Sequence, residues 1–215
     1  MRYRLAPHVS YCRIGEGFVF LDRRRDRYWC LEGAMAEAFA SLADGVASQA
    51  SAPALQNLTA SGLLTQGPGR AIAPCAAVVP RASILDRPSP RVSIALRVGA
   101  LLRTETARLA LNFRGLHRTL ARLEGGRPVR KMHPTRLAGL AAAYTMPGWF
   151  HAAEGECLRR SIGLMTALSN HGQPADLVMA VKLQPFAAHC WVQTDALLLN
   201  ERYDRVRDFT PVLVL

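Results

Sequence analysis

Prolines gather in one stretch of this 215-residue chain and divide it into two parts. Five prolines lie between residues 68 and 90, together with Gly67 and Gly69. Proline and glycine interrupt both helices and strands, so a stretch rich in them is typical of a linker. The sequence therefore predicts a first domain over residues 1–70, a linker over 71–90 and a second domain over 91–215.

The first domain begins with three segments rich in Tyr, Val, Ile, Phe and Trp, the residues favoured in strands. They cover residues 9–14, 17–21 and 27–31. Apolar residues at helical spacing follow over 34–42, and Pro53 fits the first turn of a second helix that has Leu55 and Leu58 on one face. Three strands followed by small helices predict a winged-helix-like plan.

The second domain has helical patterns first and strand patterns last. Leucines on one side and arginines on the other predict a long helix over 92–124, bent near Gly115 and ended by Gly125-Gly126. Further helices are expected over 135–146 and 157–170, and strands over 176–182, 189–193 and 197–199. The whole chain is therefore predicted to be of the α+β class.

The basic charge is concentrated in the middle of the chain. The formal net charge is +11, and residues 81–135 alone carry a net +9. Such a segment attracts a polyanion, an acidic peptide or an acidic protein face, although a solvated helix face would have the same pattern. Half of the residues are hydrophobic, which argues against a disordered or collagen-like chain. Without an apolar stretch long enough for a bilayer, or a signal peptide, we expect a cytoplasmic protein.

Five cysteines and their spacing favour reduced thiols over disulfides or a metal site. The number is odd and no CxxC pair occurs. Cys190 follows His189 directly, but neighbouring residues of a strand point to opposite faces and cannot easily share one ion. No Gly-rich phosphate loop is present either, so we expect neither a metal nor a cofactor.

Cys157 and His189 are the residues with the clearest potential for catalysis. Cys157 falls at the predicted start of a helix, where unpaired amides and the helix dipole favour a thiolate. His189 opens a predicted hairpin and could exchange a proton with that sulfur. A third group should orient the imidazole, and Asn200 or Glu201 could do so. A loop centred on Asp195 places Glu201 opposite His189, whereas a two-residue turn pairs residue 189 with 202 and puts Asn200 on the face of His189.

Four sequence features resemble those of a known family, the B proteins of lasso-peptide biosynthesis. They are Cys-Leu-x-Arg-Ser at 157–161, Gly-x-Pro-Ala at 172–175, Pro-Phe-x-Ala-His-x-Trp-Val at 185–192 and an Asn-acid pair at 200–201. The catalytic half of that family is similar to transglutaminase-type, papain-like cysteine proteases. The first 80 residues resemble its other half, a winged-helix RiPP recognition element.

The resemblance implies a leader peptidase without a cofactor. Cys157 would be the nucleophile, His189 the base and Glu201 the third member, where the family usually has Asp; Asn200 remains the alternative. The leader of a precursor peptide would add a strand along Tyr28, Trp29, Cys30 and Leu31, next to Leu55 and Leu58. The released core would pass to an ATP-dependent macrolactam synthetase, the cyclase, and the basic segment 91–131 is the expected surface for contact with it.

Three other functions fit parts of the pattern. A winged-helix protein that binds nucleic acid is disfavoured, because residues 1–80 carry a net charge of only +2. The same Cys-His-acid set could instead transfer an acyl group to an amine, since a thioester reacts with amines as well as water. An inactive scaffold is the third.

Overall fold

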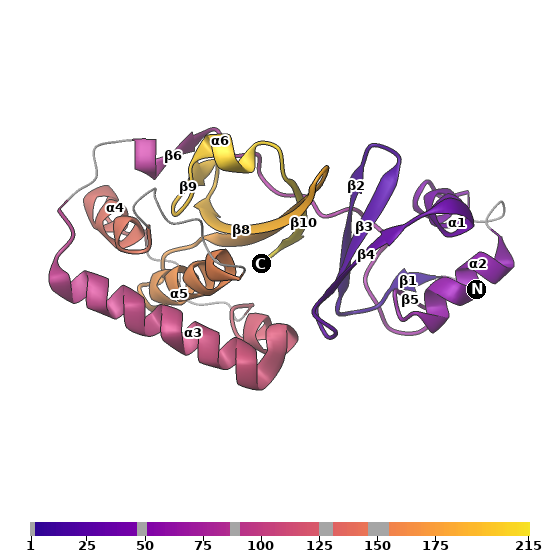
Figure 1. The fold of residues 1–215 in the computed structure, drawn as a ribbon, viewed down its shortest axis with the longest axis horizontal. Helices are drawn as coiled ribbons and strands as arrows, with labels where there is room; N and C mark the ends of the chain where they lie inside the picture. Colours follow the sequence, from indigo (N-terminus) through magenta and orange to yellow (C-terminus); the bar gives the residue numbers. More distant parts are fainter. Residues whose placement is uncertain (1–2, 47–50, 87–90, 125–130, 146–154) are drawn as a thin grey trace. The chain divides into compact units, whose positions relative to one another are not determined.

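The computed structural model describes residues 3–46, 51–86, 91–124, 131–145 and 155–215 (Figure 1). The chain divides into two compact units, residues 1–76 with 210–213 and residues 77–209 with 214–215. The boundary falls within the stretch 71–90 for which the sequence predicts a linker. Helices and strands are mixed, which confirms the predicted α+β class. None of the described helices is both long and apolar enough to cross a membrane.

An antiparallel three-stranded sheet, in the order β2-β3-β4, forms the base of the first unit. Its strands are β2 (Val9–Ile14), β3 (Gly17–Asp22) and β4 (Arg27–Leu31), close to the predicted bounds. Gly15 turns the chain between β2 and β3 at φ +58°, a conformation that suits glycine. Because β3 is central, β2 and β4 are the edge strands.

An aromatic cluster joins this sheet to the helices that follow it, α1 (Gly33–Ala43) and α2 (Ala52–Ala60). The ring of Phe39, on α1, meets the rings of Tyr11, Phe18 and Phe20 edge-on at centroid distances of 4.9, 5.0 and 4.8 Å. Edge-to-face contacts at this distance add to the stabilisation from burial. A short strand pair, β1 (Arg4–Leu5) with β5 (Leu64–Thr65), also belongs to this unit.

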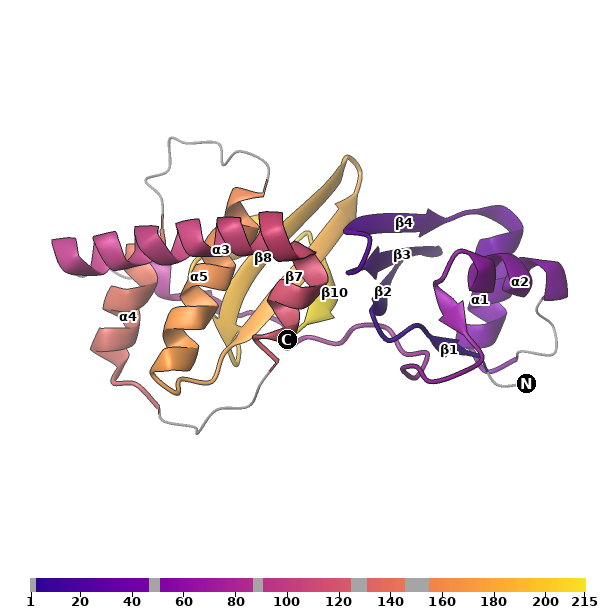
Figure 2. The same ribbon diagram turned by 90° about the horizontal axis from the view of Figure 1, so that it is seen from below.

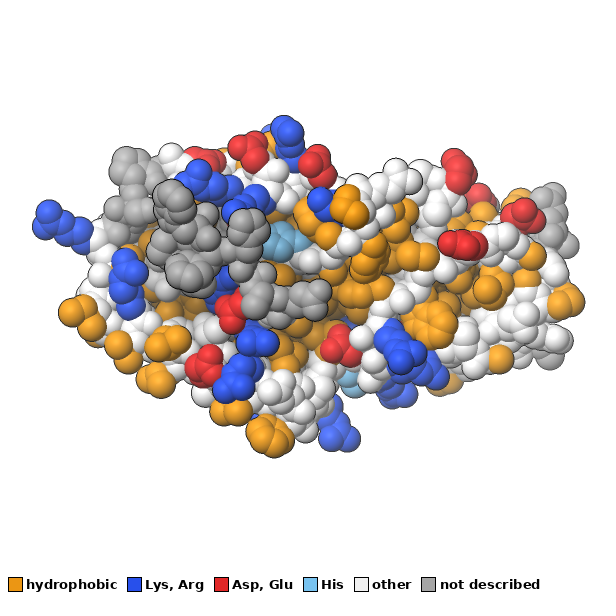
Figure 3. All heavy atoms as spheres, viewed as in Figure 1, with side chains coloured by type: hydrophobic (Ala, Val, Ile, Leu, Met, Phe, Trp, Pro, Cys, Tyr) orange, Lys and Arg blue, Asp and Glu red, His pale blue; other side chains and the backbone are white. Residues whose placement is uncertain are grey.

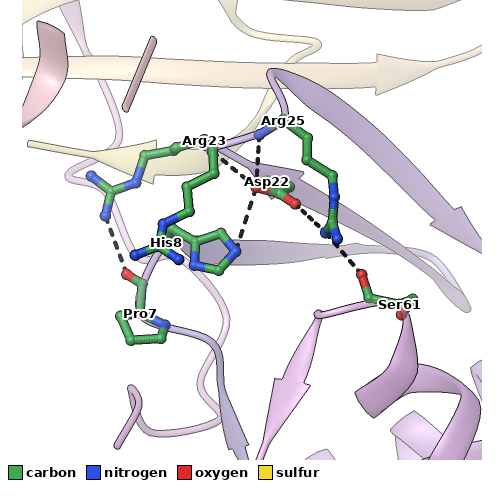
Figure 4. A network of polar contacts seen from close by, with 7 residues as sticks. Pro7, His8, Asp22, Arg23, Arg25 and Ser61 are labelled. Carbon is green, nitrogen blue, oxygen red and sulfur yellow. Dashed lines mark hydrogen bonds and ion pairs between the residues drawn. The ribbon is translucent and has the colours of Figure 1, made fainter. Parts of the chain in front are cut away.

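Asp22, at the end of β3, is a fully buried carboxylate held by a polar network (Figure 4). Its oxygens accept hydrogen bonds from the backbone N–H groups of Arg24 and Arg25 and from the Arg25 guanidinium, at 2.9, 3.1 and 2.9 Å. The same guanidinium donates to the Ser61 carbonyl just after α2. The network therefore ties the β3–β4 turn to the end of α2.

A five-stranded sheet, in the order β10-β7-β8-β9-β6, carries the second half of the chain. The strands are β6 (Ala82–Ser83), β7 (Asp176–Leu183), β8 (Phe186–Thr194), β9 (Leu197–Leu198) and β10 (Thr210–Val214). β7 and β8 form the long hairpin at its centre. The sequence patterns missed β6 and β10, which depend on partners distant in sequence.

Helices cover this sheet in two layers, as the two ribbon views show (Figure 2). α5 (Glu156–Asn170) lies against β8, and α3 (Ile94–Ala121) packs on α5, with α4 (Pro134–Ala143) beside them. A short 3-10 turn (Ile84–Asp86) and α6 (Tyr203–Val206) complete the elements. Gly163 allows the close crossing of α5 and α3, because a Cβ there would lie 3.2 Å from the Thr104 nitrogen.

The close crossing changes which side of α3 is buried. The buried residues of its first half are small: Ala100, Thr104 and Ala107. Of the leucines that we predicted to form the apolar face, Leu96, Leu101, Leu102 and Leu109 are exposed, whereas Leu116 and Leu120 are buried as predicted. The expected bend is present at Gly115, where φ is +73°. The predicted stop at Gly125-Gly126 lies outside the described residues.

Much of the stretch expected to be a linker is hydrogen-bonded. Just before it, Arg70 pairs with Leu5, and within it the Cys75 N–H donates to the Tyr11 carbonyl at 2.7 Å. At its other end, the Arg81 N–H donates to the Ala196 carbonyl at 2.8 Å. The proline-rich stretch thus forms backbone hydrogen bonds with residues of both units.

Candidate active site

Cys157 is the second residue of α5, as the sequence predicts for a nucleophile at a helix start. The helix begins after Gly155, whose φ of +83° turns the chain into it. The sulfur accepts hydrogen bonds from the backbone N–H groups of Leu158 and Cys190. Donors of this kind favour the negatively charged form of the sulfur.

His189 comes from β8 and lies between Cys157 and Glu201. Its Nε2 is 2.9 Å from Oε2 of Glu201, and the imidazole is also a hydrogen-bond partner of the Cys157 thiol. Because Nε2 is engaged by the carboxylate, Nδ1 is the nitrogen left for the sulfur. The side chains of His189 and Glu201 are only 18% and 17% exposed, so water screens the pair weakly.

These contacts set the charges of all three groups. Burial opposes an imidazolium, but the hydrogen bonds and charges of Cys157 and Glu201 outweigh it and raise the pKa of His189 to about 9. Burial likewise opposes a thiolate, yet His189 and the two amides bring the pKa of Cys157 below its ordinary value. Despite burial, His189 and the Arg202 amide also lower the pKa of Glu201. The arrangement therefore favours a thiolate–imidazolium pair backed by a carboxylate.

The structure distinguishes Glu201 from Asn200, between which the sequence left the choice open. β8 and β9 have the register of the two-residue turn, with Gln193 opposite Leu198. Continued, that register would put residue 202 opposite His189, but β9 ends at Leu198. The chain then leaves the strand path, and Glu201 reaches His189. Asn200 instead accepts from the Val192 N–H at 2.8 Å and donates to the Ser161 hydroxyl at 3.0 Å.

The residues expected to bind a leader peptide lie in the first unit. On β4, Tyr28 and Trp29 are half-buried and Cys30 is exposed. The leucines expected beside them are core residues: Leu31, Leu55 and Leu58. Of the residues expected to bind the leader, Tyr28, Trp29 and Cys30 are therefore the ones whose side chains are accessible on this strand.

Two buried polar residues on the elements that carry the site, Ser161 on α5 and Gln193 on β8, were given no role from the sequence. Ser161 is fully buried one turn after Cys157, and its hydroxyl donates to the Cys190 carbonyl at 3.1 Å. Gln193 is also fully buried; it accepts from the Trp191 indole at 2.8 Å and donates to the Val78 carbonyl at 2.8 Å. Spacing offered a hint for both, since Ser161 follows Cys157 by one turn and Gln193 shares the strand face of His189.

The second unit has a pocket that does not include the residues of the candidate active site. Its volume is about 630 Å³, and residues of α4, the α5–β7 connection and the β8–β9 turn line it, among them Leu137, Gln173, Asp176 and Asp195. None of Cys157, His189 and Glu201 contributes to its wall. Within the described ranges, no three His, Cys, Asp or Glu side chains are grouped so that they could hold a metal ion.

A cysteine at a helix N-terminus, paired with a histidine that a carboxylate orients, is the arrangement of cysteine proteases and related acyltransferases. The chain belongs to the transglutaminase-like superfamily, whose family model matches residues 100–214. The match includes all three residues of the site. Searches among curated proteins and among solved structures gave no match.

Proposed function

We propose that this protein is a leader peptidase of lasso-peptide biosynthesis. The first unit would act as a recognition element that binds the leader of a precursor peptide, and the second would hydrolyse the bond between leader and core. The observation that carries the proposal is the contact of His189 with both Cys157 and Glu201, because these groups supply the nucleophile and the proton transfers that amide hydrolysis needs.

The reaction proceeds through a thioester. The Cys157 thiolate attacks the carbonyl carbon of the scissile amide, and the C–N bond breaks as the His189 imidazolium gives its proton to the leaving amine. Water then transfers a proton to His189 while its oxygen attacks the thioester, and the C–S bond breaks. This second step restores the thiolate and the imidazolium, and Glu201 keeps the ring oriented through both.

Leader binding is assigned to β4 because it is an edge strand. Among the described residues no strand pairs with its outer side, and an extended peptide can add to such an edge through backbone hydrogen bonds. Tyr28, Trp29 and Cys30 would contact alternate side chains of the leader. Leu31, Leu55 and Leu58 would support this edge from the core.

The cyclase is assigned to the outer face of α3. Ile94, Leu101 and Phe113 are 81%, 62% and 84% exposed, and exposed arginines lie among such residues along the helix, as the space-filling view illustrates (Figure 3). Apolar side chains mixed with arginine are typical of protein interfaces. Reversing the charge of Arg97, Arg114 and Arg118 should impair transfer of the core to the cyclase more than leader cleavage. Equal loss of both would contradict this assignment.

The test of the activity uses the full chain and a precursor encoded beside its coding region. Cys157→Ala and His189→Ala should each abolish leader cleavage, followed by mass spectrometry, while the leader still binds in fluorescence anisotropy. Cys75→Ala is the matched control and should cleave normally. Cleavage that survives Cys157→Ala would refute the proposal, and products joined to an amine in place of water would assign acyl transfer instead.

A further inference from the structure

Beside Cys157, none of the described strands pairs with the edge of β8. Along β8, β9 pairs with Gln193 and Thr194 and then ends. Beyond this point Val192 still accepts from the Leu199 N–H at 2.9 Å, but its own N–H donates to the Asn200 side chain. The Cys190 carbonyl accepts from Ser161. Side chains therefore take the place of a strand along this edge.

Cys157 and Ser161 both attach to the same residue of β8. They lie four positions apart on α5 and so share one face of the helix. The Cys157 sulfur accepts from the Cys190 N–H, and the Ser161 hydroxyl donates to the Cys190 carbonyl. Because Cys190 directly follows His189, this two-point attachment lies next to the imidazole.

Asn200 joins the attachment to the segment that carries the carboxylate. It donates to the Ser161 oxygen, accepts from the Val192 N–H and immediately precedes Glu201. The Glu201 carbonyl is itself held by the Ser83 hydroxyl at 2.7 Å. The network thus touches the three segments that bring together Cys157, His189 and Glu201.

We propose that Ser161 and Asn200 are positioning residues, which fix α5 against β8 so that the Cys157 sulfur stays at the His189 ring. Neither residue contacts the reacting atoms. Removing either hydrogen-bonding group leaves α5 free to shift along the β8 edge by a fraction of an ångström, and the interaction between sulfur and imidazole weakens with that shift. The inference rests on the assigned Cys157–His189 pair but not on the identity of the substrate.

The test measures how fast iodoacetamide alkylates Cys157 at different pH values, in the full chain and with each cysteine resolved by peptide mass spectrometry. Ser161→Ala and Asn200→Ala should move the alkylation profile of Cys157 to higher pH. A move of one pH unit would reduce the rate about tenfold on the acidic side of the profile. Ser161→Thr, which keeps the hydroxyl, should restore most of the reactivity.

Thr166→Val is the matched control, because the Thr166 hydroxyl on the same helix donates to the Ile162 carbonyl of that helix. It should leave the Cys157 profile unchanged. The proposal is overturned if Ser161→Ala lowers the melting temperature yet keeps the parent profile, since the role would then be structural alone. It is also overturned if Thr166→Val shifts the profile as much. Neither result depends on leader cleavage, so failure here is distinguishable from failure of the proposed function.

Discussion

Glu201 should determine the pH range in which His189 remains protonated. The pKa of His189 is about 9 in the structure, against an ordinary value of 6.5. That difference corresponds to roughly 3 kcal/mol of preference for the imidazolium, which Cys157 and Glu201 supply together against the cost of burial. Replacing Glu201 by Gln keeps the size of the side chain but removes one of the two charges. The His189 pKa should therefore fall from about 9 toward 6.5.

NMR titration of the histidine rings measures this change without any substrate. The chain has six histidines, and the spectrum of His189→Gln identifies the signal of interest. Asp204→Asn is the control, because Asp204 is an exposed carboxylate on α6 for which the structure gives no contact with His189. The Asp204→Asn variant should leave the pKa of His189 unchanged.

The same change has a consequence for cleavage. The productive pair exists above the lowered pKa of Cys157 and below that of His189, so kcat/KM should fall at high pH as the imidazolium loses its proton. In Glu201→Gln this alkaline decline should begin at lower pH. A His189 ring that titrates near 6.5 in the parent protein, or at the same pH in Glu201→Gln as in the parent, would refute the electrostatic reasoning.

Three further predictions concern stability, each checked by chemical denaturation. Asp22→Asn should lower the free energy of unfolding of the first unit by about 1–3 kcal/mol, because it removes a buried charge partner of Arg25. The hydrogen bonds from Arg25 and Arg24 outweigh burial and depress the native pKa of Asp22 below its ordinary 3.8. The difference in stability between parent and variant should therefore be present above pH 3.8 and shrink as the pH falls through that native pKa. Phe39→Ala should cost about 3–5 kcal/mol by opening a cavity in the aromatic cluster. Gly163→Val should lower the free energy of unfolding by about 1–3 kcal/mol, because the added side chain forces α3 away from α5. Gly139→Ala is the comparison: a Cβ at this position of α4 meets nothing within 4 Å, so the change should raise the free energy of unfolding by up to about 1 kcal/mol. Equal effects at the two glycines would contradict the argument that α3 and α5 cross closely at Gly163.

Local patterns predicted the elements that form from neighbouring residues. Strands β2, β3 and β4 and the α5 helix fall within one residue of their expected bounds, because alternation, helical spacing and turn residues act over short stretches of chain. Cys157 could be placed at a helix start for the same reason. β6 and β10 were missed because each is defined by a partner far away in sequence.

The face of α3 shows a different limit of the sequence pattern. Leucine spacing predicts which residues share a side of a helix, but not which side meets its neighbour. In the first half of α3, the approach of α5 at Gly163 leaves room for the small residues Ala100, Thr104 and Ala107, and the larger leucines of this half are exposed. Knowledge of the neighbouring helix, and not of α3 itself, would have been needed to choose between the two sides.

The early end of β9 is the feature that makes the site possible. In a regular hairpin of the observed register, residue 202 would oppose His189, and Glu201 would point to the other face of the sheet. A longer β9 would also occupy the backbone groups of Cys190 and Val192 that Cys157, Ser161 and Asn200 use instead. Because β9 ends after two residues, Glu201 can reach the imidazole, and the same end of the strand leaves the edge of β8 accessible to α5. It follows that a change which prolongs the β8–β9 pairing should separate the carboxylate and the thiolate from His189 together.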